Sequence, residues 1–232
     1  MKILALDTAT EACSAALLID GVVASREVEL GRGHAEYILA MIDELLAEAA
    51  QTLRHLDAIA FGRGPGGFTG VRLAASVTQG LAFGVGLGVV PVSDLMAVAQ
   101  QVVGIDASAQ RVVVCNDARM REVYWGCFER GADGLVVPVG QERVDAPERV
   151  VVPPAWSVAR PEGAGRGFAA YPELIARLRP GLNSVHDTLL PSAREIALLA
   201  VPEVRAQRLV PAEQAIPVYL RDDVAKPADS RN

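Results

Sequence analysis

The strongest constraint on this chain is a glycine-rich turn at 62–72, GRGPGGFTGVR, which leads directly into an apolar run of small residues at 73–83. Glycines before a helix let backbone N–H groups approach an anion at the positive end of the helix dipole. The turn lacks the lysine that a Walker-type phosphate loop carries. The segment therefore predicts a turn followed by a helix, and it leaves open whether the turn binds a ligand or packs against protein.

Composition limits the classes of function. The chain has 232 residues, 51% of them hydrophobic, which is enough to bury one sizeable core or two small lobes. Its net charge of −6 does not supply the positive field that drives binding to a phosphate backbone. Two local basic pairs, Arg119 with Arg121 and Arg205 with Arg208, are of a kind that is commonly solvated. We therefore do not expect direct, high-affinity binding of nucleic acid.

The cysteines and the N-terminus indicate the compartment. Cys13, Cys115 and Cys127 lie in apolar, strand-like runs without CxxC spacing or nearby histidines, so they are predicted to be reduced core residues. Asp7 interrupts the first apolar run, which leaves no segment of signal-peptide length, and no membrane span is expected. The expected location is the cytoplasm, with no membrane partner.

The order of elements predicts an α/β fold with two lobes. The first half alternates predicted strands, at 3–6, 15–19, 22–28, 56–61 and 85–92, with predicted helices, at 34–50, 69–83 and 93–103. The second half adds predicted strands at 111–116, 122–128, 135–139 and 150–152 and helices at 170–178 and 192–200. The small, polar stretch at 104–110 separates them. This predicts an N-terminal lobe at 1–104, a C-terminal lobe at 105–221 and a flexible tail at 222–232.

Each half opens with a strand that ends in an acidic turn, as in the architecture shared by sugar kinases, actin and the Hsp70 ATPase. In that architecture the first turn can hold phosphates and a metal. The residues that would form a vestigial nucleotide site here are Asp7, Thr8, Gly64, Gly66 and Gly67. The alternative is that Asp7 only closes a β-turn through hydrogen bonds of its own side chain.

Several motifs together are more specific than the glycine turn alone. They are LDTAT at 6–10, HAE at 34–36, GPGGFTGVR at 64–72, DAR with EVY at 117–124, and PVYLR at 217–221. On these motifs the chain resembles the bacterial TsaB (YeaZ) family, subunits of the machinery that makes threonylcarbamoyladenosine in tRNA. The resemblance spans nearly the whole chain, and it implies a two-lobed ASKHA-like fold with mixed sheets flanked by helices.

The resemblance also implies a function and its partners. It implies a noncatalytic scaffold for TsaD, the enzyme that transfers threonylcarbamoyl to N6 of adenosine 37 in tRNAs reading ANN codons, with the ATPase TsaE as third member. The chain would have no cofactor of its own, ATP and a metal would bind the partner subunits, tRNA would be reached only through the complex, and the isolated chain would form a homodimer.

One position of the TsaD metal motif differs in this chain. TsaD carries a His-x-x-x-His pair on a helix, whereas the corresponding stretch here runs from His34 to Ile38. One histidine without a second ligand in register does not hold a metal tightly. We therefore expect no metal site, and we expect His34 to be a helix-start or interface residue.

If catalysis is lost, the helices at 34–50 and 69–83 become the predicted partner or dimer surface. Its predicted residues are His34, Ile38, Met41, Ile42, Leu45, Val71, Ala74, Val77, Thr78 and Leu81. The alternative is that both apolar stripes pack against the chain's own sheet. Two other functions remain as alternatives: an independent nucleotide-dependent enzyme, and a peptidase of the partner, although none of the three histidines accompanies a recognisable serine-nucleophile motif.

Overall fold

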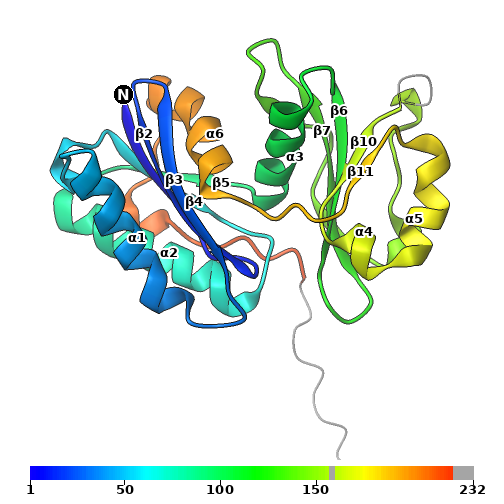
Figure 1. The fold of residues 1–232 in the computed structure, drawn as a ribbon, viewed down its shortest axis with the longest axis horizontal. Coiled ribbons are helices and arrows are strands. Elements are labelled where there is room, and N and C mark those ends of the chain that lie inside the picture. The colour runs from blue at the N-terminus through cyan, green and yellow to red at the C-terminus, as the bar shows by residue number, and fades with distance from the viewer. Residues whose placement is uncertain (157–159, 222–232) are drawn as a thin grey trace, which may run out of the picture.

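The computed structural model describes residues 1–156 and 160–221, so the tail predicted at 222–232 lies outside the described residues. Two mixed β-sheets stand next to each other, and helices cover their faces (Figure 1). This confirms the predicted α/β fold with two lobes and mixed sheets.

The first sheet has five strands in the order β3-β2-β1-β4-β5. The strands are β1 (Lys2–Asp7), β2 (Ala12–Ile19), β3 (Val22–Glu29), β4 (Ala58–Gly62) and β5 (Val89–Val92). β1, β4 and β5 pair in parallel, whereas at one edge β2 pairs antiparallel with β1 and β3 pairs antiparallel with β2. Asp20 and Gly21 join β2 to β3 with φ values of 48° and 92°, which are the positive values that a tight hairpin turn requires.

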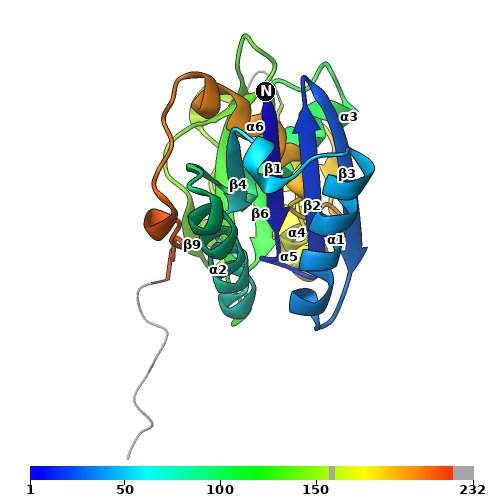
Figure 2. The same cartoon turned by 90° about the vertical axis from the view of Figure 1, so that its left-hand side faces the viewer.

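Helices cover both faces of this sheet. On the outer face lie α1 (His34–Glu48) and α2 (Phe68–Val85), side by side (Figure 2). On the inner face lies α6 (Ala193–Arg205), which packs against α3 (Asp94–Ile105). Because both faces are covered, β1, β2 and β4 are buried along almost their whole length.

The second sheet has the order β11-β10-β6-β7-β8, with β9 also paired to β7. Its strands are β6 (Arg111–Asp117), β7 (Val123–Arg130), β8 (Val136–Pro138), β9 (Arg143–Asp145), β10 (Glu162–Ala164) and β11 (Val185–His186). α3 packs on one face, and α4 (Gly167–Ala170) and α5 (Pro172–Leu178) cover the other. The strand predicted at 150–152 does not form, and the carbonyl of Val150 instead accepts a hydrogen bond from the side chain of Arg177 at 2.8 Å.

The chain returns to the first lobe after the second sheet is complete, so the lobes are not the consecutive segments 1–104 and 105–221. α6 packs on β1, β2, β4 and β5, and Val210 forms an antiparallel bridge with Val89. One continuous apolar cluster runs from the first sheet through α6 and α3 to the second sheet. The α6–α3 layer therefore joins the two lobes through a shared core.

Candidate functional site

The glycine turn packs against its own chain. A Cβ at Gly66 would lie 2.5 Å from the carbonyl oxygen of Ala9, and a Cβ at Gly70 would overlap the carbonyl oxygen of Thr8. The N–H of Gly67 donates to the Ala9 oxygen at 2.6 Å. Only glycine allows so close an approach of two backbones. The sequence left open whether these glycines bind a ligand or pack against protein. In the structure they pack the start of α2 against the turn after β1.

Asp7 is an interior residue that pairs with a second carboxyl group. Asp7 and Asp94 are both fully buried, and both point an oxygen at the space beside Gly62. Asp7 accepts from the N–H of Ala9 at 3.1 Å, and Asp94 accepts from the N–H of Gly64. Burial raises the pKa of Asp7 to about 6, and burial together with the neighbouring Asp7 raises the pKa of Asp94 well above its ordinary value.

These contacts do not fit a nucleotide and its metal. Asp7 turns toward Asp94 in the interior, and Gly66 and Gly70 are occupied by backbone contacts. Gly64 has a φ of 100°, and a Cβ there would lie 2.8 Å from the carbonyl oxygen of Val218. Within residues 1–156 and 160–221, no group of three or more acidic, histidine or cysteine side chains could hold a metal ion. Of the five residues predicted as a vestigial nucleotide site, Asp7 and Gly64 are engaged by contacts within the chain, whereas Thr8, Gly66 and Gly67 also line a cavity, so the nucleotide site stays a prediction.

A cavity of about 730 Å³ opens between the lobes at the start of α2. Its walls come from the turn after β1, the entry to α1, the glycine turn, the end of β6 and the C-terminal segment 218–221. The Thr8 hydroxyl lies in this wall and donates to the carbonyl of Gly70 at 2.7 Å. The polar group predicted for phosphate contact is thus used for local packing.

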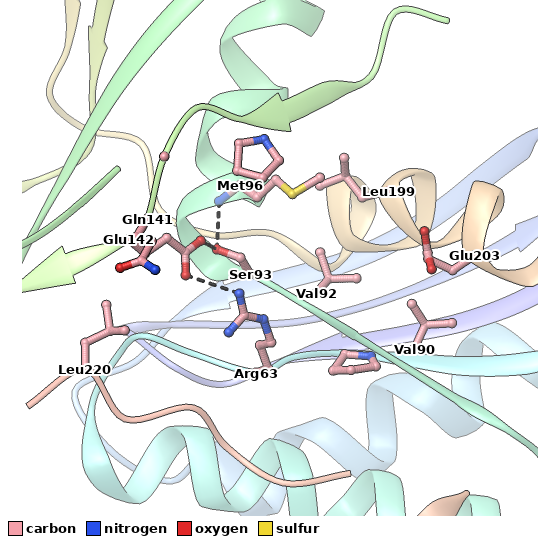
Figure 3. A pocket seen from close by; sticks show the side chains of 13 residues that line it. Arg63, Val90, Val92, Ser93, Met96, Gln141, Glu142, Leu199, Glu203 and Leu220 are labelled. Carbon is pink, nitrogen blue, oxygen red and sulfur yellow. Dashed lines mark hydrogen bonds and ion pairs between the residues drawn. The ribbon is translucent and has the colours of Figure 1, made fainter. Parts of the chain in front are cut away.

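A second cavity, of about 550 Å³, lies between the lobes around Glu142 (Figure 3). Glu142 comes from the second lobe, and Arg63 of the first lobe forms an ion pair with it at 3.2 Å. Ser93 donates to Glu142 and also caps α3 by accepting from the N–H of Met96 at 3.1 Å. Glu142 therefore ties the second lobe to both the glycine turn and the start of α3.

The structure corrects the predicted interface. Most of its members face the chain's own sheet and are buried: Ile38, Met41, Ile42, Leu45, Val71, Ala74 and Thr78. Val77 and Leu81 are half-buried against the same core. The alternative interpretation was right for these residues, because helical periodicity identifies the most apolar face, and in this fold that face covers the outer side of the first sheet.

The outward face of α2 carries a different pattern, and its residues are not among those predicted for the interface. Across 18 residues, α2 has a single charged side chain, Arg72. Ser76, Gly80 and Gly84 form an exposed line at intervals of four residues, and Phe83 beside them is 79% exposed. A Cβ at Gly80 or Gly84 would meet open space, so the packing of this chain does not require glycine there. The signal was present in the sequence as two interior helix glycines at i, i+4.

The side chains on α1 that could join this surface are also exposed. Tyr37 is 46% and Leu39 is 48% exposed, and neither was among the predicted interface residues. His34 begins α1, as predicted, and its Nε2 lies 2.9 Å from the carbonyl oxygen of Thr10. His34 thus ties the helix start to the turn after β1.

A serine and a histidine meet in the second lobe, but their geometry does not suit peptidase chemistry. Ser184 Oγ lies 3.1 Å from His186 Nε2 and donates to Glu162 at 2.5 Å. Its proton is therefore directed to the carboxylate rather than to the imidazole. A catalytic serine needs the opposite arrangement, with the histidine as base and the acid behind the histidine.

The basic pairs noted in the sequence are mostly neutralised. Arg119 pairs with Glu11 at 3.0 Å and with Asp117 at 2.9 Å, Arg121 with Glu173, and Arg208 with Glu203.

The three cysteines are buried and free, as predicted. No helix in the described part of the chain is long and apolar enough to cross a membrane.

The two-lobed α/β architecture with a glycine turn ahead of α2 places the chain in the ASKHA class of folds. Residues 21–228 match the family model "TsaD: tRNA N6-adenosine threonylcarbamoyltransferase". The tRNA threonylcarbamoyladenosine biosynthesis protein TsaB of Escherichia coli K12 is 39% identical, with 97% of this chain and 96% of that protein covered. The Haemophilus influenzae protein of the same name is 38% identical, with 97% and 95% covered.

Solved structures agree with these relatives. YeaZ from Pseudomonas aeruginosa has 43% identity and a TM-score of 0.84, covering 94% of this chain and 99% of that one. Another structure from Pseudomonas aeruginosa, described as similar to the peptidase YeaZ, has 45% identity and a TM-score of 0.88, covering 95% and 99%. The chain belongs to the TsaB (YeaZ) family of tRNA threonylcarbamoyladenosine biosynthesis proteins, and it is related to TsaD.

Proposed function

We propose that this protein is a noncatalytic subunit that binds the transferase TsaD through the outward face of α1 and α2 and holds that enzyme in its active arrangement. ATP and a metal would act in the partner subunits, TsaE would be the third member, and tRNA would be reached only through the complex. The isolated chain would use the same face to form a homodimer, and the complex would work in the cytoplasm.

The observation that carries this proposal is the composition of the α2 outward face. Glycine inside a helix costs roughly 1 kcal/mol of stability relative to alanine. At Gly80 and Gly84 no close packing within this chain offsets that cost, because the space beyond them is open. Small residues in a line let a second helix approach closely, and the exposed Phe83 adds apolar area. A surface of this kind supports a helix-packing partner.

The assignment as noncatalytic rests on the interior of the first lobe. Asp7, which would have to face a nucleotide and metal, is buried against Asp94, and the glycine turn is in contact with the backbone of Thr8 and Ala9. The second function considered, an independent nucleotide-dependent enzyme, would require these groups to leave their present partners.

The test is Gly80→Glu, which separates binding from folding. Glutamate has a higher helix propensity than glycine and its Cβ meets open space, so the free energy of unfolding should rise by roughly 0.5 kcal/mol. The bulky, charged side chain should nevertheless weaken binding of TsaD from the same organism, measured by calorimetry, by at least about tenfold, since the helices could no longer approach closely.

The matched control is Gly104→Glu. Gly104 is an exposed glycine of α3, and a Cβ there also meets open space, but it lies away from α1 and α2. This variant should bind TsaD as the wild type does. Equal binding by all three proteins, with the Gly80 variant folded, would contradict the proposal.

A further inference from the structure

Arg72 stands out because it is the single charge on α2 and because aromatic side chains hold it. Its guanidinium carbon lies 3.5 Å from the ring centroid of Phe68 and 5.5 Å from that of Tyr219. Its Nε donates to the Tyr219 hydroxyl at 2.7 Å. Arginine stacked on aromatic faces keeps a fixed orientation while its terminal N–H groups stay available. We call Phe68, Arg72 and Tyr219 the Arg72 cluster.

The segment that supplies Tyr219 is itself fixed in place. The carbonyl of Ala215 accepts from the side chain of Gln79 at 3.1 Å, and the N–H of Val218 donates to the carbonyl of Arg63 at 2.7 Å. The close approach of Val218 to Gly64 adds a contact on the other side. The C-terminal segment is therefore seated on the start of α2, and the Arg72 cluster is organised before any partner arrives, which lowers the entropy lost on binding.

The cluster is exposed and carries the positive charge of Arg72. Phe68 is 51% and Tyr219 is 46% exposed, and Arg72 is exposed as well. Within residues 1–156 and 160–221, Arg72 forms no ion pair, and neither does Arg32 on the wall of the adjoining cavity. The positive end of the α2 dipole adds to the same field. If a partner buries this surface, the guanidinium of Arg72 therefore needs an anionic group of that partner as its counter-charge.

We propose that the Arg72 cluster receives a carboxylate side chain of the partner protein, with the arginine fork binding it bidentately and the two rings packing around it. Arginine and tyrosine are enriched among the residues that dominate binding energy, and a planar guanidinium matches a carboxylate. A run of nucleic-acid phosphates is less suitable, because two of the three arginines that line the adjoining cavity, Arg119 and Arg221, already pair with acidic side chains and the chain carries a net charge of −6. The inference rests on the proposed function, since it concerns one end of the same α2 surface.

The experiment compares Arg72→Gln and Arg72→Lys in calorimetric titrations with TsaD from the same organism. Gln should weaken binding about 10- to 100-fold. Lys should weaken it nearly as much, because lysine keeps the charge but loses the planar fork and the stacking. Tyr219→Phe retains the ring and removes only the hydroxyl, so it should give a smaller loss. Arg54→Gln, at an exposed arginine on the short turn 53–55, is the control and should bind normally.

Three outcomes would overturn the inference. Wild-type affinity in Arg72→Gln would show that no carboxylate is bound, and full affinity in Arg72→Lys would show that charge alone acts. Weaker binding of tRNA with unchanged binding of TsaD would assign the cluster to RNA. If Gly80→Glu abolishes TsaD binding while the Arg72 variants do not, only this inference fails, whereas normal binding by Gly80→Glu contradicts the proposed function itself. Unchanged melting temperatures of the Arg72 variants exclude an effect through folding.

Discussion

Replacing Asp7 with asparagine should stabilise the protein relative to wild type, and this stabilisation should be larger at neutral pH than at acidic pH. In the native protein, burial raises the pKa of Asp7 from 3.8 to about 6. A rise of this size corresponds to about 3 kcal/mol. Between pH 3.8 and about pH 6 the Asp7 carboxyl keeps its proton in the native state but has lost it in the unfolded chain. The wild-type free energy of unfolding therefore falls as the pH rises through this range.

Asparagine removes this titration while keeping the local contacts. Its oxygen can accept from the N–H of Ala9, and its amide can donate to Asp94. The difference in unfolding free energy, variant minus wild type, should therefore increase by roughly 2–3 kcal/mol between pH 4 and pH 7. Urea denaturation of both proteins at several pH values measures this difference, in which contributions from groups that do not interact with Asp7 cancel, whereas that of Asp94 does not.

Two further variants test the reasoning. Asp94→Asn should shift the difference in the same direction, because its oxygen can still accept from Gly64 and its amide can donate to Asp7. Asp43→Asn, on the exposed side of α1, should leave the difference flat. A difference for Asp7→Asn that stays constant from pH 4 to pH 7 would refute the argument that the buried carboxyl pair determines this pH dependence.

Three other predictions concern packing. Gly70→Ala should lower the free energy of unfolding by about 3 kcal/mol in urea denaturation, since the new Cβ overlaps the Thr8 carbonyl, and an unchanged value would contradict the packing role of the glycine turn. Val71→Asp should unfold the protein, seen by circular dichroism, because this buried residue would become an unpaired interior charge. Glu142→Gln should cost about 1 kcal/mol and speed hydrogen exchange where β5 meets α3, since the Arg63 ion pair is lost; equal exchange rates would argue against an interlobe tie.

Much of the fold followed from local sequence. Short apolar runs predicted most strands, and the helix predicted at 34–50 does begin at His34. These features depend on residues close together in the chain, so local propensity and hydrophobic period determine them. The return of the chain to the first lobe could not be predicted from local sequence, because the residues of 193–205 do not indicate which sheet α6 covers.

The site shows the same division. The sequence predicted the partner surface on α1 and α2, and this stays a prediction. It selected Ile38 and Ile42, which pack in the core of the first sheet, and Val71, which is also buried. The two helix glycines, Gly80 and Gly84, were visible in the sequence, but whether they face outward depends on what covers the opposite face of α2.

Contacts between distant segments were decided by the tertiary structure alone. Asp7 and Asp94 are 87 positions apart in the chain, and Arg72 meets Tyr219 only because the C-terminal segment returns to the first lobe. Most elements, the glycine turn and the family motifs could be predicted from the sequence, because each depends on residues that are neighbours in the chain. Burial, the proximity of Asp7 to Asp94 and the stacking of Arg72 depend on which surfaces meet, and that is set by the packing of the two sheets around α6 and α3.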